Sequence, residues 1–116
     1  MTNAKSPPQA FLDTQVELLQ AGDTAGLANR YAEDATFARF DRVANGREEI
    51  RKLFDDYLTE KPEISTMDGI QMTDDLILYQ AAERLSGRLT TAVGTLAFKD
   101  GLVWRQTVAF VDHRPS

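Results

Sequence analysis

The sequence predicts an α+β fold in which three helices precede a run of antiparallel strands. Apolar residues recur at helical spacing as far as Leu58, and from Ile64 onward they alternate with polar residues. The alternating segments are separated by Asp74-Asp75, Ser86-Gly87 and Asp100-Gly101, and such pairs are typical of hairpin turns. Hairpins need no crossover, so we expect a mainly antiparallel sheet with helices on one face rather than a doubly wound parallel sheet.

Each helix is indicated by its end signals and its apolar spacing. Ser6 is expected to cap the first helix, with Pro7 at its first position, and Gly22 ends it. Asp23 can cap the second helix, and the third follows the Asn45-Gly46 turn. The apolar positions of the three helices are Phe11, Leu12, Val16 and Leu19; Leu27, Ala28 and Tyr31; and Ile50, Leu53, Phe54, Tyr57 and Leu58.

The strands and the domain limits follow from the same pattern. A short strand is expected over 35–40, and four longer ones near 64–72, 76–85, 88–98 and 102–112. No repeat or low-complexity linker interrupts the chain. We therefore expect a flexible tail over 1–5, a single domain over 6–113 and a C-terminal tail over 114–116.

Composition argues against several classes of protein. The 116 residues include 18 acidic and 13 basic ones, for a net charge of -5, and no basic block that would favour nucleic acid or an anionic membrane. Without cysteine and with one histidine, the chain offers no disulfide and no recognisable metal site. No phosphate-binding glycine motif appears, so no cofactor is expected. The polar N-terminus and the lack of an apolar run of ~18 residues predict a cytoplasmic protein.

Three segments carry a resemblance to a known family. They are GDTAGLANRYAEDATF at 22–37, NGREEIRKLF at 45–54 and the hairpin around Lys99-Asp100-Gly101. Over roughly 11–111, the sequence resembles the nuclear transport factor 2-like (NTF2-like) superfamily, whose small-molecule branch includes SnoaL-like polyketide cyclases, ketosteroid isomerases and limonene epoxide hydrolases. The resemblance implies an NTF2-like (cystatin-like) cone, with the helices in the concave face of a curved sheet, a pocket at one end and a homodimer.

The catalytic positions of the isomerases in this family are replaced here. Their first-helix tyrosine corresponds to Gln15, their general base to Arg39, and their second oxyanion donor falls near Gly94. We therefore expect a small, largely apolar ligand but not the ketosteroid isomerase mechanism. Isomerase, cyclase and hydrolase activities stay open. The alternatives are a non-catalytic module for ligand binding or for dimerisation and protein interaction and, with less support, a nuclear-transport-type adaptor.

The resemblance also indicates which strand face lines the pocket. It places Glu83 inside an apolar wall, where burial would raise the pKa of its carboxyl group and make it an acid or base. Asp41 is the second catalytic candidate. The ligand-binding candidates are Gln15, Arg39, Tyr79, Trp104, Gln106 and Phe110.

Each candidate also has a purely structural interpretation. Glu83 could pair with Arg39 or Arg88, and Arg39 with Asp41 could form a surface ion pair. Gln15 and Gln106 could satisfy one another or the backbone, and Trp104 and Phe110 could be core residues. The single histidine, His113, is expected to be exposed and without a role.

Overall fold

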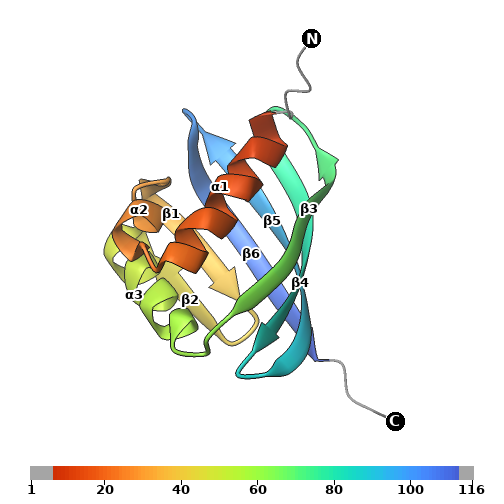
Figure 1. Ribbon diagram of the computed structural model, residues 1–116. Helices are drawn as coiled ribbons and strands as arrows, with labels where there is room; N and C mark the ends of the chain where they lie inside the picture. Colours follow the sequence, from red (N-terminus) through yellow and green to blue (C-terminus); the bar gives the residue numbers. More distant parts are fainter. Residues whose placement is uncertain (1–6, 113–116) are drawn as a thin grey trace.

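The computed structural model describes residues 7–112, which form three helices and one curved six-stranded sheet (Figure 1). The expected cap Ser6, His113 and the two tails lie outside the described residues. The elements are α1 Pro7–Ala21, α2 Thr24–Ala28, β1 Tyr31–Arg39, β2 Arg42–Asn45, α3 Gly46–Leu58, β3 Glu63–Met72, β4 Leu76–Leu85, β5 Arg88–Lys99 and β6 Leu102–Asp112.

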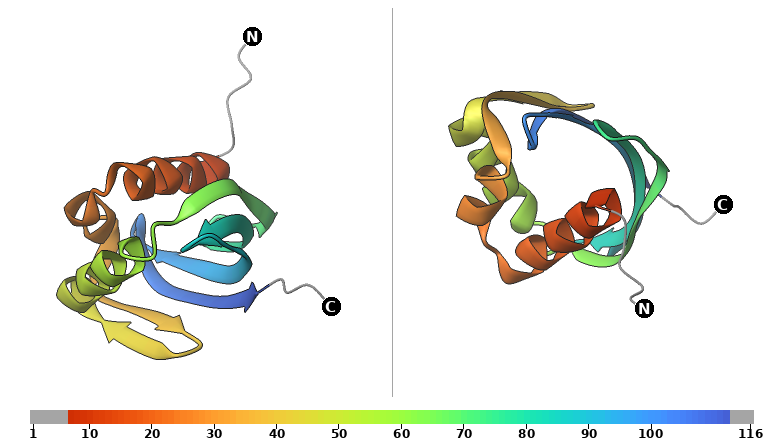
Figure 2. Two further views of the ribbon diagram at one scale, coloured as in Figure 1. Left: turned by 60° about the horizontal axis from the view of Figure 1, so that its bottom comes forward. Right: turned by 90° about the horizontal axis from the view of Figure 1, so that it is seen from above.

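The sheet is mainly antiparallel, as the sequence predicts. Its strand order is β2-β1-β6-β5-β4-β3, and the pairing of β1 with β6 is parallel. The sheet curls strongly, and α1 crosses its open side (Figure 2). The three helices thus lie on the concave face, and the α+β cone is confirmed.

The helix ends follow the local sequence. Gly22 takes a φ of 71°, a conformation that glycine adopts without strain, directly after α1. The Asp23 side chain accepts a hydrogen bond from the Gly26 amide at 2.9 Å and so caps α2. At α3, the Asn45 amide donates to Glu49 Oε1 at 2.9 Å. The predicted caps at Gly22 and Asp23 are confirmed.

The hairpin turns fix the register of the last three strands. Ser86 and Gly87 have φ values of 50° and 82°, and Asp100 and Gly101 have 54° and 80°. Two consecutive residues with positive φ define the turn whose twist matches that of paired strands. The last four strands lie within a residue of their predicted limits at each end.

Three features differ from the expectation. Tyr31, expected on the second helix, begins β1, and the unexpected strand β2 pairs with β1. Between β5 and β6, Phe98 pairs with Val103 while Ala97 pairs with Arg105, so Trp104 is the extra residue of a bulge. Because a bulge resets the alternation, Val103 and Gln106 are both buried.

The hydrophobic core lies between the helices and the concave face of the sheet. Side chains from α1, α2 and α3 meet the inward positions of β4, β5 and β6. Tyr31, Phe37 and Phe54 form a connected aromatic group with ring centroids 5.7 to 6.3 Å apart. The largest fully buried apolar side chains are Tyr31, Leu12, Leu27, Ile50, Leu53, Ile77, Leu96 and Val103.

Candidate functional site

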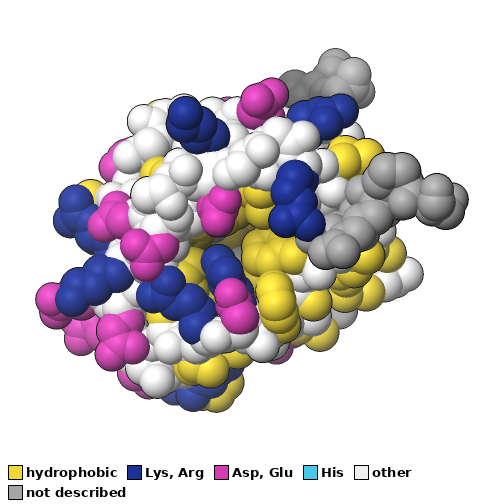
Figure 3. All heavy atoms as spheres, turned by 90° about the horizontal axis from the view of Figure 1, so that it is seen from below, with side chains coloured by type: hydrophobic (Ala, Val, Ile, Leu, Met, Phe, Trp, Pro, Cys, Tyr) yellow, Lys and Arg dark blue, Asp and Glu magenta, His cyan; other side chains and the backbone are white. Residues whose placement is uncertain are grey.

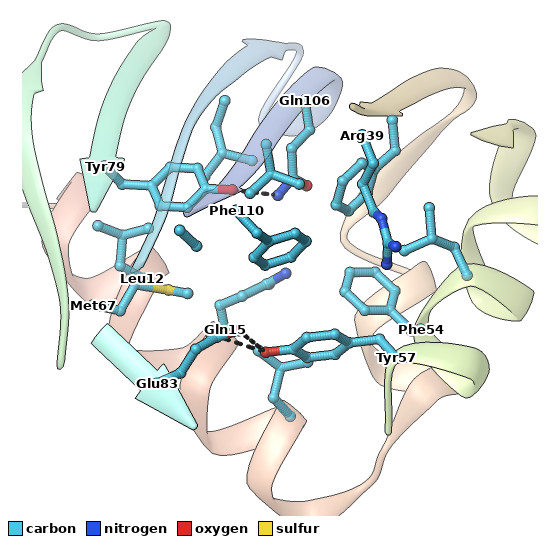
Figure 4. A pocket seen from close by; sticks show the side chains of 16 residues that line it. Leu12, Gln15, Arg39, Phe54, Tyr57, Met67, Tyr79, Glu83, Gln106 and Phe110 are labelled. Atoms are coloured by element: carbon cyan, nitrogen blue, oxygen red, sulfur yellow. Dashed lines mark hydrogen bonds between the residues drawn. The ribbon is translucent and has the colours of Figure 1, made fainter. Parts of the chain in front are cut away.

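A cavity lies between the concave face of the sheet, α1 and α3. From below, the surface is hollowed, with hydrophobic side chains in the hollow and charged ones around it (Figure 3). The void measures about 50 Å³, less than the ~150 Å³ of an apolar cavity that holds benzene. Its wall is mainly apolar. The lining residues that carry a polar group are Gln15, Arg39, Tyr57, Tyr79, Glu83 and Gln106 (Figure 4).

Glu83 is the acidic residue of this wall. Its side chain comes from β4, is only 2% exposed, and accepts hydrogen bonds from the Tyr57 hydroxyl at 3.0 Å to each carboxylate oxygen (Figure 4). Burial raises the pKa of Glu83, and the Tyr57 hydrogen bond opposes that rise. The structure therefore pairs Glu83 with a neutral donor from α3, and Arg39 bonds elsewhere.

A network of four hydrogen-bonded polar side chains runs across the cone from α1 to β4. Gln15 Nε2 donates to the Tyr31 hydroxyl at 3.3 Å, Tyr31 donates to Gln106 Oε1, and Gln106 Nε2 donates to the Tyr79 hydroxyl at 3.0 Å. Tyr31 thus joins the two glutamines. Burial is the main cause that raises the pKa of Tyr31 and of Tyr79, so both hydroxyls stay protonated at neutral pH.

Arg30 holds Gln15, the α1 end of this hydrogen-bond network, in place. Its Nη1 donates to Gln15 Oε1 at 2.8 Å and its Nη2 to the Phe11 carbonyl at 3.0 Å, while the guanidinium lies 3.5 Å from the centroid of the Phe11 ring. Burial is the main cause that lowers the pKa of Arg30. Gln15 is therefore held in one orientation.

Arg39 and Asp41 lie at the open end. Arg39 donates from Nε and Nη2 to the two carboxylate oxygens of Asp41 at 2.9 and 2.8 Å. Arg39 lines the cavity, with its guanidinium 5.4 Å from the Phe110 ring centroid, whereas Asp41 is not among the lining residues. The hydrogen bond from Arg39 is the main cause that lowers the pKa of Asp41.

The two aromatic candidates are placed differently. Phe110 lines the cavity, stacks on Tyr57 with ring centroids 6.5 Å apart, and meets the exposed Phe40 edge-on at 6.2 Å. Trp104 does not line the cavity. The bulge removes it from the alternation, and its ring packs 3.8 Å from the Arg105 guanidinium.

The structure therefore brings six of the predicted site residues together and separates two. Gathered at one cavity are Gln15, Arg39, Tyr79, Glu83, Gln106 and Phe110. Asp41 and Trp104 lie outside its wall. Tyr57 and Tyr31 were not among the predicted site residues: both were expected to pack helix against sheet, with hydroxyls that need a partner, and no partner was named. The available signal was a tyrosine on an apolar face, since a buried hydroxyl needs a hydrogen-bond partner.

The position expected for a second oxyanion donor cannot hold a side chain here. A Cβ built on Gly94 would lie 2.6 Å from the Tyr79 hydroxyl and would clash with the Thr107 carbonyl. Within residues 7–112, no three His, Cys, Asp or Glu side chains are grouped so that they could hold a metal ion. None of the helices in that range is long and apolar enough to cross a membrane.

Comparison with known proteins gives the fold. No protein-family model and no curated protein matches the sequence. An NTF2-like protein of unknown function from Burkholderia xenovorans has 20% identity over 86% of this chain and 79% of its own, with a TM-score of 0.71. A candidate ketosteroid isomerase from Kribbella flavida has 18% identity over 86% and 74%, with a TM-score of 0.74.

A candidate polyketide cyclase from Sinorhizobium meliloti is similar to the same degree. It has 19% identity over 79% of this chain and 86% of its own, with a TM-score of 0.70. At these sequence identities the similarity shows the fold alone, and an activity has to be argued from the residues of the site. The helices, the curved sheet and these neighbours together show that this chain has the NTF2-like fold.

Proposed function

We propose that the chain binds a small, largely apolar molecule in the cone and that Glu83 exchanges a proton with it. The observation that carries the proposal is the position of Glu83: buried, on the cavity wall, and hydrogen-bonded to a neutral hydroxyl. A carboxyl group with a raised pKa can accept and return a proton closer to neutral pH than an exposed one.

The reaction class that fits is proton transfer beside a carbonyl, the step shared by isomerisation and enolate cyclisation. The Glu83 carboxylate accepts the proton from carbon, and the electron pair moves to the carbonyl oxygen. Tyr79 can stabilise that oxygen, because its hydroxyl accepts from Gln106 while its own proton goes to no described residue. Two of the similar structures are described as a candidate isomerase and a candidate cyclase, which supports this class.

Deuterium exchange tests the proposal without knowledge of the natural substrate. Acetone and butanone are among the smallest ketones, which suits a void of about 50 Å³, and exchange of their α-protons in D₂O is followed by ¹H NMR. We expect the wild-type protein to accelerate exchange and Glu83→Gln to abolish that acceleration. The matched control is Glu63→Gln, which removes an exposed carboxylate from β3. Equal rates for wild type and Glu83→Gln would rule out the proton-transfer role.

The alternative function is a dimerising, non-catalytic module, and the outer sheet face favours dimerisation. Leu89, Val93 and Val111 are exposed there on adjacent strands, since Thr91 pairs with Val111 and Val93 with Ala109. We propose a homodimer through this face. Light scattering after size exclusion tests it: Val93→Lys should give monomers, whereas the control Val43→Lys, at β2, should not. A monomeric wild type at high concentration would contradict it.

A further inference from the structure

We propose that the ligand of this cavity carries a carboxylate, which binds the free edge of the Arg39 guanidinium while a short apolar tail enters the cone. The inference rests on the proposed small-molecule site and adds the chemical class of its ligand. It is argued from the donors that Arg39 still has available, from the charges around the cavity and from the size of the void.

Arg39 has three N–H donors that Asp41 does not use. A guanidinium carries five N–H groups, and Asp41 takes one from Nε and one from Nη2. The Nη1 group and the second hydrogen of Nη2 bond to no described residue. These remaining donors form an edge of the same fork geometry that matches a carboxylate.

The position of Arg39 directs this edge to the cavity. In Figure 4, its side chain extends past Phe110 toward Phe54 and Tyr57. Burial is the main cause that raises the pKa of Tyr57, and the charge of Arg39 opposes that rise, so the guanidinium lies close enough to act on a hydroxyl inside the site. Asp41, held on the opposite edge, is a positioning residue that keeps the planar group oriented.

The charges around the cavity limit the ligand to one negative charge. Arg39 is the one cationic side chain among the lining residues. Glu83 lies on the same wall, and Asp41 adds a negative charge behind Arg39. Both carboxyl groups would repel a dianion such as a phosphate monoester more strongly than a monoanionic carboxylate, which needs only the free N–H donors of Arg39.

The small void limits the tail. On the scale of the ~150 Å³ cavity that holds the six carbons of benzene, a void of about 50 Å³ limits the enclosed part of the tail to about two carbons. The apolar contacts offered to such a tail come from Phe37, Phe54 and Phe110. The ligand class is therefore a short-chain aliphatic acid, ionised at neutral pH, whose tail carries the carbonyl group that the proposed proton transfer requires.

The test compares matched acids and amides. Isobutyrate and isobutyramide have nearly the same shape and differ in charge, and their binding is measured by ¹H–¹⁵N NMR titration of the 116-residue protein. We expect isobutyrate to bind at least about tenfold more tightly than the amide, the size of effect given by a charged hydrogen-bonded pair. In Arg39→Met, the preference for the acid should vanish while amide binding remains.

Two further variants complete the experiment. Arg39→Lys keeps the charge but loses the fork, so it should retain only part of the preference. Arg42→Gln removes an exposed arginine that pairs with Asp56 outside the cavity, and it should behave as wild type.

The outcomes separate this inference from the proposed function. Equal binding of acid and amide within the cone would overturn the carboxylate assignment and leave small-molecule binding intact. An acid preference that survives in Arg39→Met would overturn it as well, since another group would then recognise the charge. Absence of binding by both probes would contradict the inference, and the ketone exchange experiment would still decide proton transfer independently.

Discussion

The Tyr57 hydroxyl lies 3.0 Å from both carboxylate oxygens of Glu83, so one donor from α3 serves both acceptors of a buried acid on β4. This contact connects the helix to the sheet across the cavity. Burial raises the pKa of Glu83 because it opposes ionisation, and this hydrogen bond lowers the pKa because it favours the charged form.

Removal of the Tyr57 hydroxyl should raise the pKa of Glu83 further. In Tyr57→Phe the phenyl ring stays, and the contribution that lowers the pKa of Glu83 is lost. A ¹³C NMR titration of the labelled Glu83 carboxyl group in both proteins measures the change. Phe54→Leu, which alters an adjacent ring without a hydroxyl, is the control. An unchanged pKa in Tyr57→Phe would show that the hydrogen bond is unimportant in solution.

Glu83 should make the protein less stable as the pH rises. Its pKa is raised in the folded state from an ordinary value of 4.5, so between these two pKa values the folded chain binds more protons than the unfolded one. The free energy of unfolding therefore falls with pH through that window, by about 1.4 kcal/mol for each unit of the shift. Above the pKa of Glu83 in the folded state, the free energy of unfolding stays lower by this full amount.

Glu83→Gln should remove this cost. We expect the variant to be more stable than wild type above the folded pKa and nearly equal to it below pH 4.5, measured by urea unfolding across pH. Glu63→Gln serves as the exposed control. A variant that is less stable than wild type at pH 8 would contradict the sign.

Gly94 should tolerate no side chain. A Cβ there would clash with the Thr107 carbonyl and lie 2.6 Å from the Tyr79 hydroxyl, so we expect Gly94→Ala to cost about 1–3 kcal/mol or more, as overpacked cores do. Gly69→Ala is the matched control on edge strand β3, because its Cβ would meet the flexible end of Met72. Chemical denaturation of the two variants measures both costs. Similar losses would argue against a special role for Tyr79 in filling this space.

Tyr31→Phe should destabilise the hydrogen-bond network between α1 and β4. Loss of its hydroxyl leaves Gln106 Oε1 without its donor and Gln15 Nε2 without its acceptor, which costs about 1–3 kcal/mol for each buried group left unsatisfied. Tyr79→Phe removes an acceptor from Gln106 alone and should cost less. Both are measured by urea unfolding. A larger loss of stability in Tyr79→Phe than in Tyr31→Phe would mean that water takes the place of the Tyr31 hydroxyl.

The fold was largely predictable because its determinants are local. Ser86-Gly87 and Asp100-Gly101 define their turns through two residues each, and Asp23 caps α2 within three residues. The site was less predictable. Trp104 was expected on the inward face, but its position depends on a bulge that arises from the pairing of two strands. The alternation of apolar and polar residues within one strand does not show where pairing with the next strand will leave an extra residue.

Partners across the cavity were equally hidden from the sequence. Tyr57 and Glu83 are 26 residues apart, and Tyr31 and Gln106 are 75 apart. Sequence reasoning could place each side chain on a face, and it could name Arg39 as a neighbour of Asp41 on one strand. It could not tell which of the buried acids and hydroxyls would meet.

The strand order has a consequence for assembly on the ribosome. Because β6 lies between β1 and β5, the β1–β2 hairpin has no other strand beside it until the final strand is made. Nascent chains emerge N-terminus first, so that hairpin waits with an unpaired edge through most of synthesis. A chain cut short before residue 102 would keep two disconnected pieces of sheet, and the cone could not close.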